Sequence, residues 1–231
     1  MVHLPRIGIS EKKRTILEFW MLPVRSGAFV IHRSATMNEL LKKFNEYKDI
    51  SNYRIKYILA NDDLIEFRLK QTDFPHLIGL HKLVDIPIIG QFNDISNTTV
   101  SAKFLISKIK KENFLTESII KNSIHFPKIE QRYQNFSKNN LLTLTYTDAI
   151  IDFNASLIDS KLRGDYILFE NQKLQGYTYL SIAKDAQKNR YAESFFYNST
   201  DIYIRNQKVV KVKKFEVYDK NGKLYLEDSI G

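Results

Sequence analysis

Two histidines, His76 and His81, lie five positions apart in the apolar segment TDFPHLIGLHKL, which spans residues 72–83. An imidazole titrates near pH 6.5, so either ring could take up or release a proton at neutral pH. In a regular helix a five-residue spacing turns two side chains about 140° apart, and in a strand it places them on opposite faces. The spacing disfavours a metal ion shared by both rings, so each histidine is interpreted on its own.

His76 has two possible roles. It could be a partly buried ring that begins a helix after Pro75 or bonds a nearby carbonyl. It could instead be an acid or base for RNA cleavage, a reaction that needs one group to remove the 2′-hydroxyl proton, another to protonate the leaving oxygen, and cations near the phosphate. That chemistry needs no metal and no cofactor, and none is expected.

The charge favours a polyanionic partner. The chain has 35 Lys and Arg against 26 Asp and Glu, a net charge of +9, and basic residues gain affinity for phosphates by releasing counterions. In KVVKVKK, lysines alternate with valines, which is typical either of a solvated edge strand or of a rail for an RNA backbone. The basic candidates for RNA binding are Lys82 with the adjacent His81, Lys161, Arg163, Arg190, Arg205, Lys211 and Lys213.

Several classes of protein are excluded or disfavoured. The chain has no cysteine, so it forms no disulfide and has no thiolate nucleophile or cysteine-ligated zinc. Its most apolar N-terminal stretch, ILEFWMLPV, is interrupted by Glu18 and is too short to span a membrane. We therefore expect a cytoplasmic protein that does not bind membranes.

The helices and strands that position these residues are predicted mainly as helices in the first part of the chain and as strands in the second. Thr36 to Glu39 forms a capping box that predicts a helix ending near Lys48, and residues 53–69 predict a hairpin. Residues 98–138 look mostly helical, and short alternating strands follow from residue 141, ending in a hairpin at Asn221-Gly222. The sequence thus predicts an α+β fold, with a helical N-terminal half packed on a C-terminal antiparallel sheet. We expect an N-terminal extension over residues 1–35 and a single domain over 36–231.

Four segments in this order resemble a known family: FPHLIGLHKL, GDYILFE, GYTYLSIAKD and YAESFFYNSTDIYIRNQKVVKV. The chain is similar to the fourth phage branch of the BECR nucleases, the superfamily of barnase, EndoU, colicin and RelE-like ribonucleases, over roughly residues 36–218. Ile78 stands where the family pattern often has a hydroxyl residue. The matching motif residues are Phe74, His76, Leu77, Gly79, Asp165, Tyr166, Ser194, Phe195, Phe196, Tyr203 and Gln207.

The resemblance implies a BECR-like nuclease fold with a site built from His76, Ser194, Tyr203 and Gln207. It favours a metal-independent endoribonuclease, of the toxin or phage and mobile-element defence type, with RNA and an inhibitor or antitoxin protein as partners. Structural alternatives stay open, because Ser194 could bond backbone between its aromatic neighbours and Gln207 could cap a turn. Two other functions also stay open: a nucleic-acid-binding module without catalysis, and, less favoured, a metal-dependent DNA nuclease, for which GYTYLSIAK lacks the preceding acid.

Overall fold

The computed structural model describes residues 38–93, 100–111, 114–142, 146–171 and 176–229. They belong to one compact unit, Met37–Gly231. The predicted boundary between residues 35 and 36 lies outside the described residues and stays a prediction. No helix in the described part of the chain is long and apolar enough to cross a lipid bilayer.

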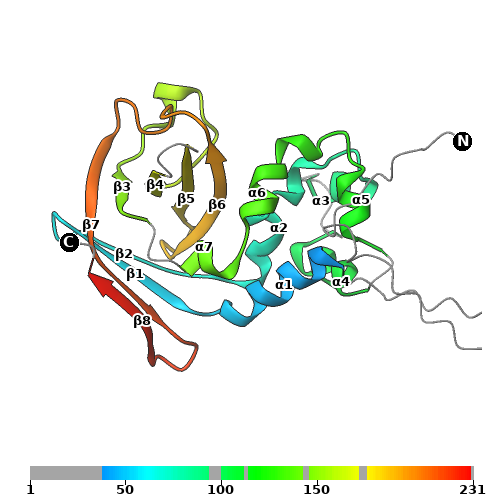
Figure 1. Cartoon of the computed structure of the whole chain (residues 1–231), viewed down its shortest axis with the longest axis horizontal. Helices are drawn as coiled ribbons and strands as arrows, with labels where there is room; N and C mark the ends of the chain where they lie inside the picture. The colour runs from blue at the N-terminus through cyan, green and yellow to red at the C-terminus, as the bar shows by residue number, and fades with distance from the viewer. Residues whose placement is uncertain (1–37, 94–99, 112–113, 143–145, 172–175, 230–231) are drawn as a thin grey trace, which may run out of the picture. The chain divides into compact units, whose positions relative to one another are not determined.

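The strands form one eight-stranded sheet that closes on itself in a barrel-like ring (Figure 1). The order is β1-β2-β6-β5-β4-β3-β7-β8, and β7 pairs with β1 as well, which closes a ring of seven strands and leaves β8 outside it. Neighbours are antiparallel except β2 and β6, which meet in parallel at Arg68 and Tyr191. The strands are β1 (Arg54–Leu59), β2 (Leu64–Arg68), β3 (Asp148–Ile151), β4 (Tyr166–Asn171), β5 (Tyr177–Lys184), β6 (Arg190–Asn198), β7 (Lys208–Tyr218) and β8 (Leu224–Ser229).

Alternation along the strands gives the ring two different faces. On the inner face, side chains such as Tyr57, Leu180, Phe195 and Phe215 join the main core cluster. On the outer face, a second cluster gathers β-strand residues with aromatic residues of the loops that lie over them. Its buried members are Ile150, Ile167, Phe169, Tyr179 and Phe196. Strand β6 therefore has Phe195 facing inward and Phe196 facing outward.

Short helices gather beside β6, and α2 and α6 contact that strand directly (Figure 1). Phe136, just after α6, packs its ring edge-on against Phe195 with centroids 5.8 Å apart, so the helical core continues into the ring. The helices are α1 (Glu39–Ile50), η2 (Gln71–Asp73), α2 (Phe74–Leu77), η3 (Leu80–Lys82), α3 (Pro87–Asn93), α4 (Ala102–Lys110), α5 (Glu117–Lys121), η4 (Phe126–Lys128), α6 (Glu130–Asn135), α7 (Lys138–Leu142) and η5 (Ala155–Ile158).

Helix α1 begins slightly later than the sequence predicts. Asn38 is its N-cap, and the Asn38 side chain accepts a hydrogen bond from the Leu40 amide, while Thr36 of the predicted capping box lies outside the described residues. The helix ends at Ile50, and it buries Leu40, Phe44 and Tyr47 as expected from their spacing.

The chain is α+β, but its two halves are not divided as predicted. The early hairpin β1–β2 is part of the same sheet as the late strands, because β1 pairs with β7 from Arg54–Tyr218 to Leu59–Val212. A helical first half packed on a separate C-terminal sheet is therefore not what forms. The physical reason is that closing the ring pairs the edge strands that an open sheet would expose.

The strand predicted from residue 141 is also wrong where the structure describes it. Leu141 and Leu142 are buried residues of α7, and residues 143–145 lie outside the described part. Ser137 starts this helix, because its hydroxyl accepts a hydrogen bond from the Asn140 amide at 3.2 Å. The cap favours a helical turn over the weak alternation of LLTLTY.

Candidate active site

A glycine brings His76 and His81 together. His76 lies in α2, which has Pro75 in its first turn, and Gly79 follows with a left-handed φ of +91° before η3 begins. The two rings consequently lie 5.1 Å apart, centre to centre, at 42°. The prediction that they point apart is wrong, because it assumed one continuous element and Gly79 interrupts it.

The position and the neutral charge state of His76 suit a general base. Its residue is exposed, and the ring packs against Phe92 with centroids 5.1 Å apart. The neighbouring protein removes part of the ring's hydration, which lowers the His76 pKa below its ordinary value of 6.5. The neutral ring, which can accept a proton, is therefore favoured near neutral pH.

His81 is also neutral, but it is more enclosed. Burial, and then the nearby His76, Arg132 and Lys82, lower its pKa to about 3. Its ring nitrogen Nδ1 is buried and has no hydrogen-bond partner among the described residues. As a neutral ring at neutral pH, His81 adds no positive charge to an RNA-binding surface.

Arg132, on α6, links His76 to the loop that carries Tyr203. Its Nη1 donates to the backbone oxygen of His76 at 3.4 Å. A Cβ at Gly79 would lie only 2.9 Å from Arg132 Cδ, so the arginine side chain can pack this closely because residue 79 has no side chain. Burial lowers the Arg132 pKa to about 10, and nearby Tyr203 partly opposes this shift. The guanidinium remains charged at neutral pH.

Lys82 lies among three other basic side chains, Arg132, Lys161 and Lys128. Burial lowers the pKa of Lys82, and the positive charges of Arg132, Lys161 and Lys128 lower it further. No carboxylate in the described part of the chain forms an ion pair with any of these four side chains. We call Lys82, Lys128, Arg132 and Lys161 the unpaired basic cluster. Repulsion among like charges is relieved when an anion such as a phosphate binds between them.

Ser194 lies on β6 beside a β-bulge. Ser194 pairs with Ser181 of β5, whereas the next pair is Ala192 with Ile182, so Glu193 is the extra residue. The Glu193 carboxylate accepts hydrogen bonds from the Ser181 hydroxyl at 2.8 Å and from the Arg163 amide at 3.0 Å. Bulges often re-aim side chains next to functional sites. Here the bulge holds the loop that carries Lys161 and Arg163.

Tyr203 and Gln207 share the loop between β6 and β7. The Tyr203 ring packs on Phe196 with centroids 4.8 Å apart and on Tyr179 at 5.4 Å. The Gln207 side chain accepts from the Asn154 amide and donates to the Asn154 carbonyl, both at 3.0 Å. Gln207 therefore connects its own loop to the loop that carries Asn154, which is a structural role. Tyr203, on the same loop as Gln207, lies near Arg132.

The predicted lysine rail on β7 is paired with acids. Lys211 Nζ lies 2.7 Å from Asp148, and Lys213 Nζ lies 3.4 Å from Asp62. Arg205 is similarly paired with Asp201 at 2.7 Å. These three residues are exposed, but their charges are partly compensated, unlike those of the unpaired basic cluster.

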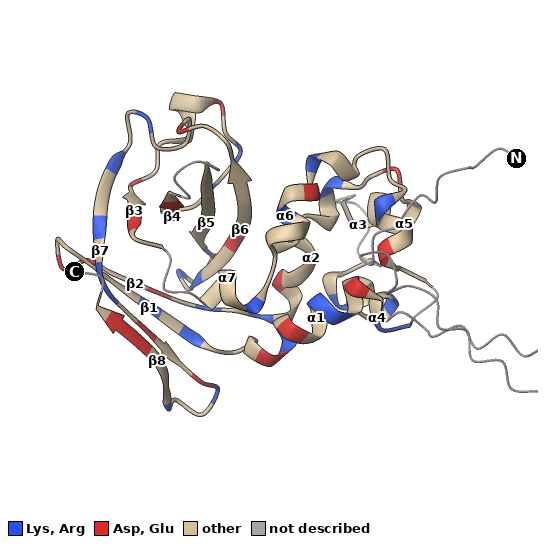
Figure 2. Ribbon diagram, in the orientation of Figure 1, with Lys and Arg blue, Asp and Glu red and all other residues tan. Residues whose placement is uncertain are grey.

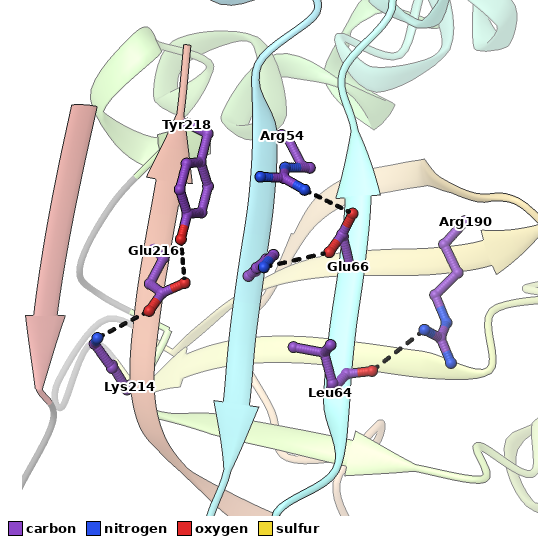
Figure 3. Close-up of polar contacts among 8 residues, drawn as sticks. Arg54, Leu64, Glu66, Arg190, Lys214, Glu216 and Tyr218 are labelled. Atoms are coloured by element: carbon purple, nitrogen blue, oxygen red, sulfur yellow. Dashed lines mark hydrogen bonds and ion pairs between the residues drawn. The ribbon is translucent and has the colours of Figure 1, made fainter. Parts of the chain in front are cut away.

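On the outer face of β2, β1 and β7, the basic side chains are likewise paired with acidic ones (Figure 3). Glu66 lies between Arg54 and Lys56, with oxygen–nitrogen distances of 3.8 and 3.7 Å. Glu216 accepts from Lys214 at 2.8 Å and from Tyr218 at 2.7 Å. Arg190 donates to the Leu64 carbonyl at 3.2 Å, and so supports the short β2–β6 junction rather than the basic cluster.

Sequence reasoning missed Arg132, Lys128 and Asp73. Asp73 precedes α2, and burial raises its pKa to about 6, so it is a second titratable group near His76. The glycine of the HLIG motif was the available signal for Arg132, since a glycine between apolar residues often marks a close approach by another segment. Nothing in the sequence identified which segment approaches.

A family model described as phage-Barnase-EndoU-ColicinE5/D-RelE like nuclease4 matches residues 39–229. A search of curated proteins and a search of solved structures each found no match to the chain. In the described part of the chain, no group of three or more His, Cys, Asp or Glu side chains is arranged to hold a metal ion. The family match covers the ring and the helices that carry His76 and Arg132.

Proposed function

The chain belongs to the phage-Barnase-EndoU-ColicinE5/D-RelE like nuclease4 family, and from this premise we propose that it is a metal-independent endoribonuclease. Membership in a nuclease family implies a nucleic-acid substrate. The choice of RNA and of a metal-independent route is our proposal. It rests on one observation: His76, whose neutral form is favoured, lies beside Arg132, and Arg132 in turn lies near Lys82, while no described carboxylate forms an ion pair with either cation.

In the proposed reaction, His76 removes the proton from a ribose 2′-hydroxyl. The 2′-oxygen then attacks the adjacent phosphorus, and the bond from phosphorus to the 5′-oxygen breaks. Tyr203 gives a proton to that leaving 5′-oxygen, so the products are a 2′,3′-cyclic phosphate and a 5′-hydroxyl. General acid–base transfer of this kind contributes about 10²–10⁴ to a rate.

The cations have a separate role. Arg132 and Lys82 would stabilise the added negative charge on the phosphorane, since preorganised donors are most effective where charge develops. Lys161 and Lys128 would hold the flanking backbone. Ser194 is proposed as a hydrogen-bond donor to phosphate from β6, and Gln207 as a residue that positions the Tyr203 loop through Asn154.

The biological setting is also proposed. A ribonuclease of this family would act as a toxin or as a defence protein of a phage or mobile element. Its basic site would suit an inhibitor or antitoxin protein with an acidic surface, because complementary charge speeds association and favours the correct partner.

A second candidate function is a nucleic-acid-binding module without catalysis. The observation that favours it is the packing of the His76 ring between His81 and Phe92, which gives that ring a structural use. In this alternative the unpaired basic cluster binds the phosphates and no proton is transferred.

The deciding experiment is incubation of the purified protein with defined RNAs in the presence of a chelator, followed by analysis of the product ends. We expect cyclic phosphate ends, and we expect His76→Ala to reduce cleavage by about 10²–10⁴ while binding persists. His125→Ala is the matched control, because it removes an imidazole that lies near Asp85 and takes no part in the proposed proton transfer. A requirement for magnesium, or full activity in His76→Ala, would contradict the mechanism. Binding without any cleavage would favour the alternative.

A further inference from the structure

A small pocket lies under the loop that connects η5 to β4. It has a volume of about 240 Å³, and it is lined by Asp152, Phe153, Leu162, Arg163, Gly164, Asp165, Tyr166 and Lys184. Pockets for drug-sized ligands usually have about 300–1,000 Å³. This pocket therefore suits a smaller group, of the size of a single ring system.

The lining combines flat rings with paired charges. Phe153 and Tyr166 are both half-buried, and the Arg190 guanidinium lies over the Tyr166 ring at 4.9 Å from its centre. Asp165 and Lys184 form an ion pair of 2.6 Å, and both side chains remain partly exposed. A carboxylate has about four lone-pair sites and an ammonium has three protons, so the pair can still accept from one group and donate to another.

The loop that covers the pocket is fixed to the sheet. The Arg163 amide donates to both oxygens of Glu193, at 3.0 and 3.2 Å. A Cβ at Gly164 would lie 2.2 Å from the Ser181 hydroxyl and 3.0 Å from the Ile182 carbonyl, so only a glycine lets the loop come this close. The pocket is thus a preorganised feature, which reduces the cost of ordering it on binding.

The same loop connects the pocket to the proposed active site. Lys161, which belongs to the unpaired basic cluster, is four residues before Asp165, so their Cα atoms lie at most about 14 Å apart along the chain. A strand of RNA held by Lys161 and Lys82 would place a neighbouring nucleotide within reach of the pocket.

We propose that this pocket binds one unpaired nucleobase of the RNA, next to the phosphate that is cleaved. The inference rests on the proposed function. Proteins recognise single-stranded RNA by stacking splayed bases on aromatic rings or arginine planes and by hydrogen bonding to their edges. Phe153 and Tyr166 provide the rings, and the Asp165–Lys184 pair provides an acceptor beside a donor for a base edge.

The test is a set of RNA oligonucleotides in which one nucleotide at a time lacks its base. Cleavage by the wild type and binding by His76→Ala are both measured for each oligonucleotide. We expect one position beside the cleaved bond to lose about tenfold in kcat/KM and in affinity when its base is missing, the size expected for one stacked base. Asp165→Asn and Lys184→Met should remove the preference for which base stands there, whereas Asp62→Asn, which breaks an exposed ion pair elsewhere on the ring, should retain it.

The outcomes separate this inference from the proposed function. RNA that is bound with base dependence but never cleaved would support the pocket and refute the catalysis. RNA that is cleaved equally well at every missing base, or with unchanged base preference in Asp165→Asn and Lys184→Met, would refute the pocket and leave the catalysis standing. An absence of RNA binding in both proteins would refute both.

Discussion

At the scale of single residues, Arg132 connects more parts of the site than any residue suggested by the motifs. It donates to the backbone of His76, passes over Gly79, and lies near Lys82 and Tyr203. Arg132 is half-buried, so its guanidinium loses part of its hydration without gaining a carboxylate partner in the described residues, a cost that a bound anion would offset. A phosphate that becomes more negative during cleavage is such an anion.

We therefore expect Arg132→Ala to reduce kcat by about 10²–10³, the usual effect of removing one preorganised donor at the point where charge develops. Arg132→Lys keeps a positive charge but loses the planar fork, so it should recover only part of the rate. Single-turnover cleavage measures the rate, and thermal unfolding of each variant shows whether it is folded. A folded Arg132→Ala variant with the wild-type rate would exclude a role in catalysis.

His81 gives a prediction about stability and pH. Its pKa is about 3 in the folded protein and about 6.5 when exposed, so the unfolded chain binds a proton that the folded protein excludes. The contribution of His81 to stability is complete above pH 6.5 and decreases as the pH falls toward 3. The decrease is at most about 1.4 kcal/mol per pH unit. His81→Gln should remove this component of acid destabilisation.

The wild type must be compared with His81→Gln, because Asp73 changes the stability with pH in the opposite direction to His81. Burial raises its pKa from 3.8 to about 6, so the folded protein binds that proton more tightly and gains stability on acidification across this range. Denaturant unfolding of the wild type and of His81→Gln at several pH values gives the difference due to His81. A difference that stays constant between pH 7 and pH 4 would show that His81 titrates normally.

At the scale of elements, Gly79 determines the geometry of the histidine segment. It ends α2 in the left-handed region, and its missing side chain leaves room for Ile129 and Arg132. An alanine in that conformation costs about 1–2 kcal/mol, and overpacking costs about 1–3 kcal/mol more. We expect Gly79→Ala to reduce the free energy of unfolding by about 2–5 kcal/mol.

Gly222 offers a matched control. It has a similar φ of +81°, but a Cβ there would meet nothing within 4 Å. Gly222→Ala should therefore lose only the conformational part, about 1–2 kcal/mol. Equal losses in the two variants, measured by denaturant unfolding, would mean that the approach of Arg132 to Gly79 is not tight.

The elements also show what the sequence could predict. The strands from Tyr166 to Leu226 were predictable because their alternation and turn residues are local signals. The ring was not, because it depends on β1 pairing with β7 and on one parallel contact of β2 with β6, across more than a hundred residues. His76 and Tyr203 are candidates taken from the family motifs, whereas the candidate Arg132 needed the packing of α6 over Gly79.

At the scale of the whole molecule, basic residues are spread over both the ring and the helices (Figure 2), but their surroundings differ. On the ring, acids lie within ion-pair distance of Lys211, Lys213 and Lys214. Around Lys82, by contrast, no described acid forms an ion pair with Lys82, Lys128, Arg132 or Lys161. The net charge of +9 does not indicate where a polyanion would bind, and we expect it to bind at the unpaired basic cluster.

This difference predicts how RNA binding depends on salt. Each phosphate contact with single-stranded RNA contributes about −0.7 to the slope of log affinity against log salt concentration. Lys82→Gln and Lys161→Gln should each make the slope about 0.7 less steep, because each removes a cation that releases counterions on binding. Lys213→Gln should leave the slope nearly unchanged, because Asp62 already compensates Lys213. Affinities of the His76→Ala background, measured at several salt concentrations, avoid loss of the RNA by cleavage. A larger change in Lys213→Gln than in Lys82→Gln would instead place the RNA on the β7 rail, where the alternating lysines of KVVKVKK first suggested it.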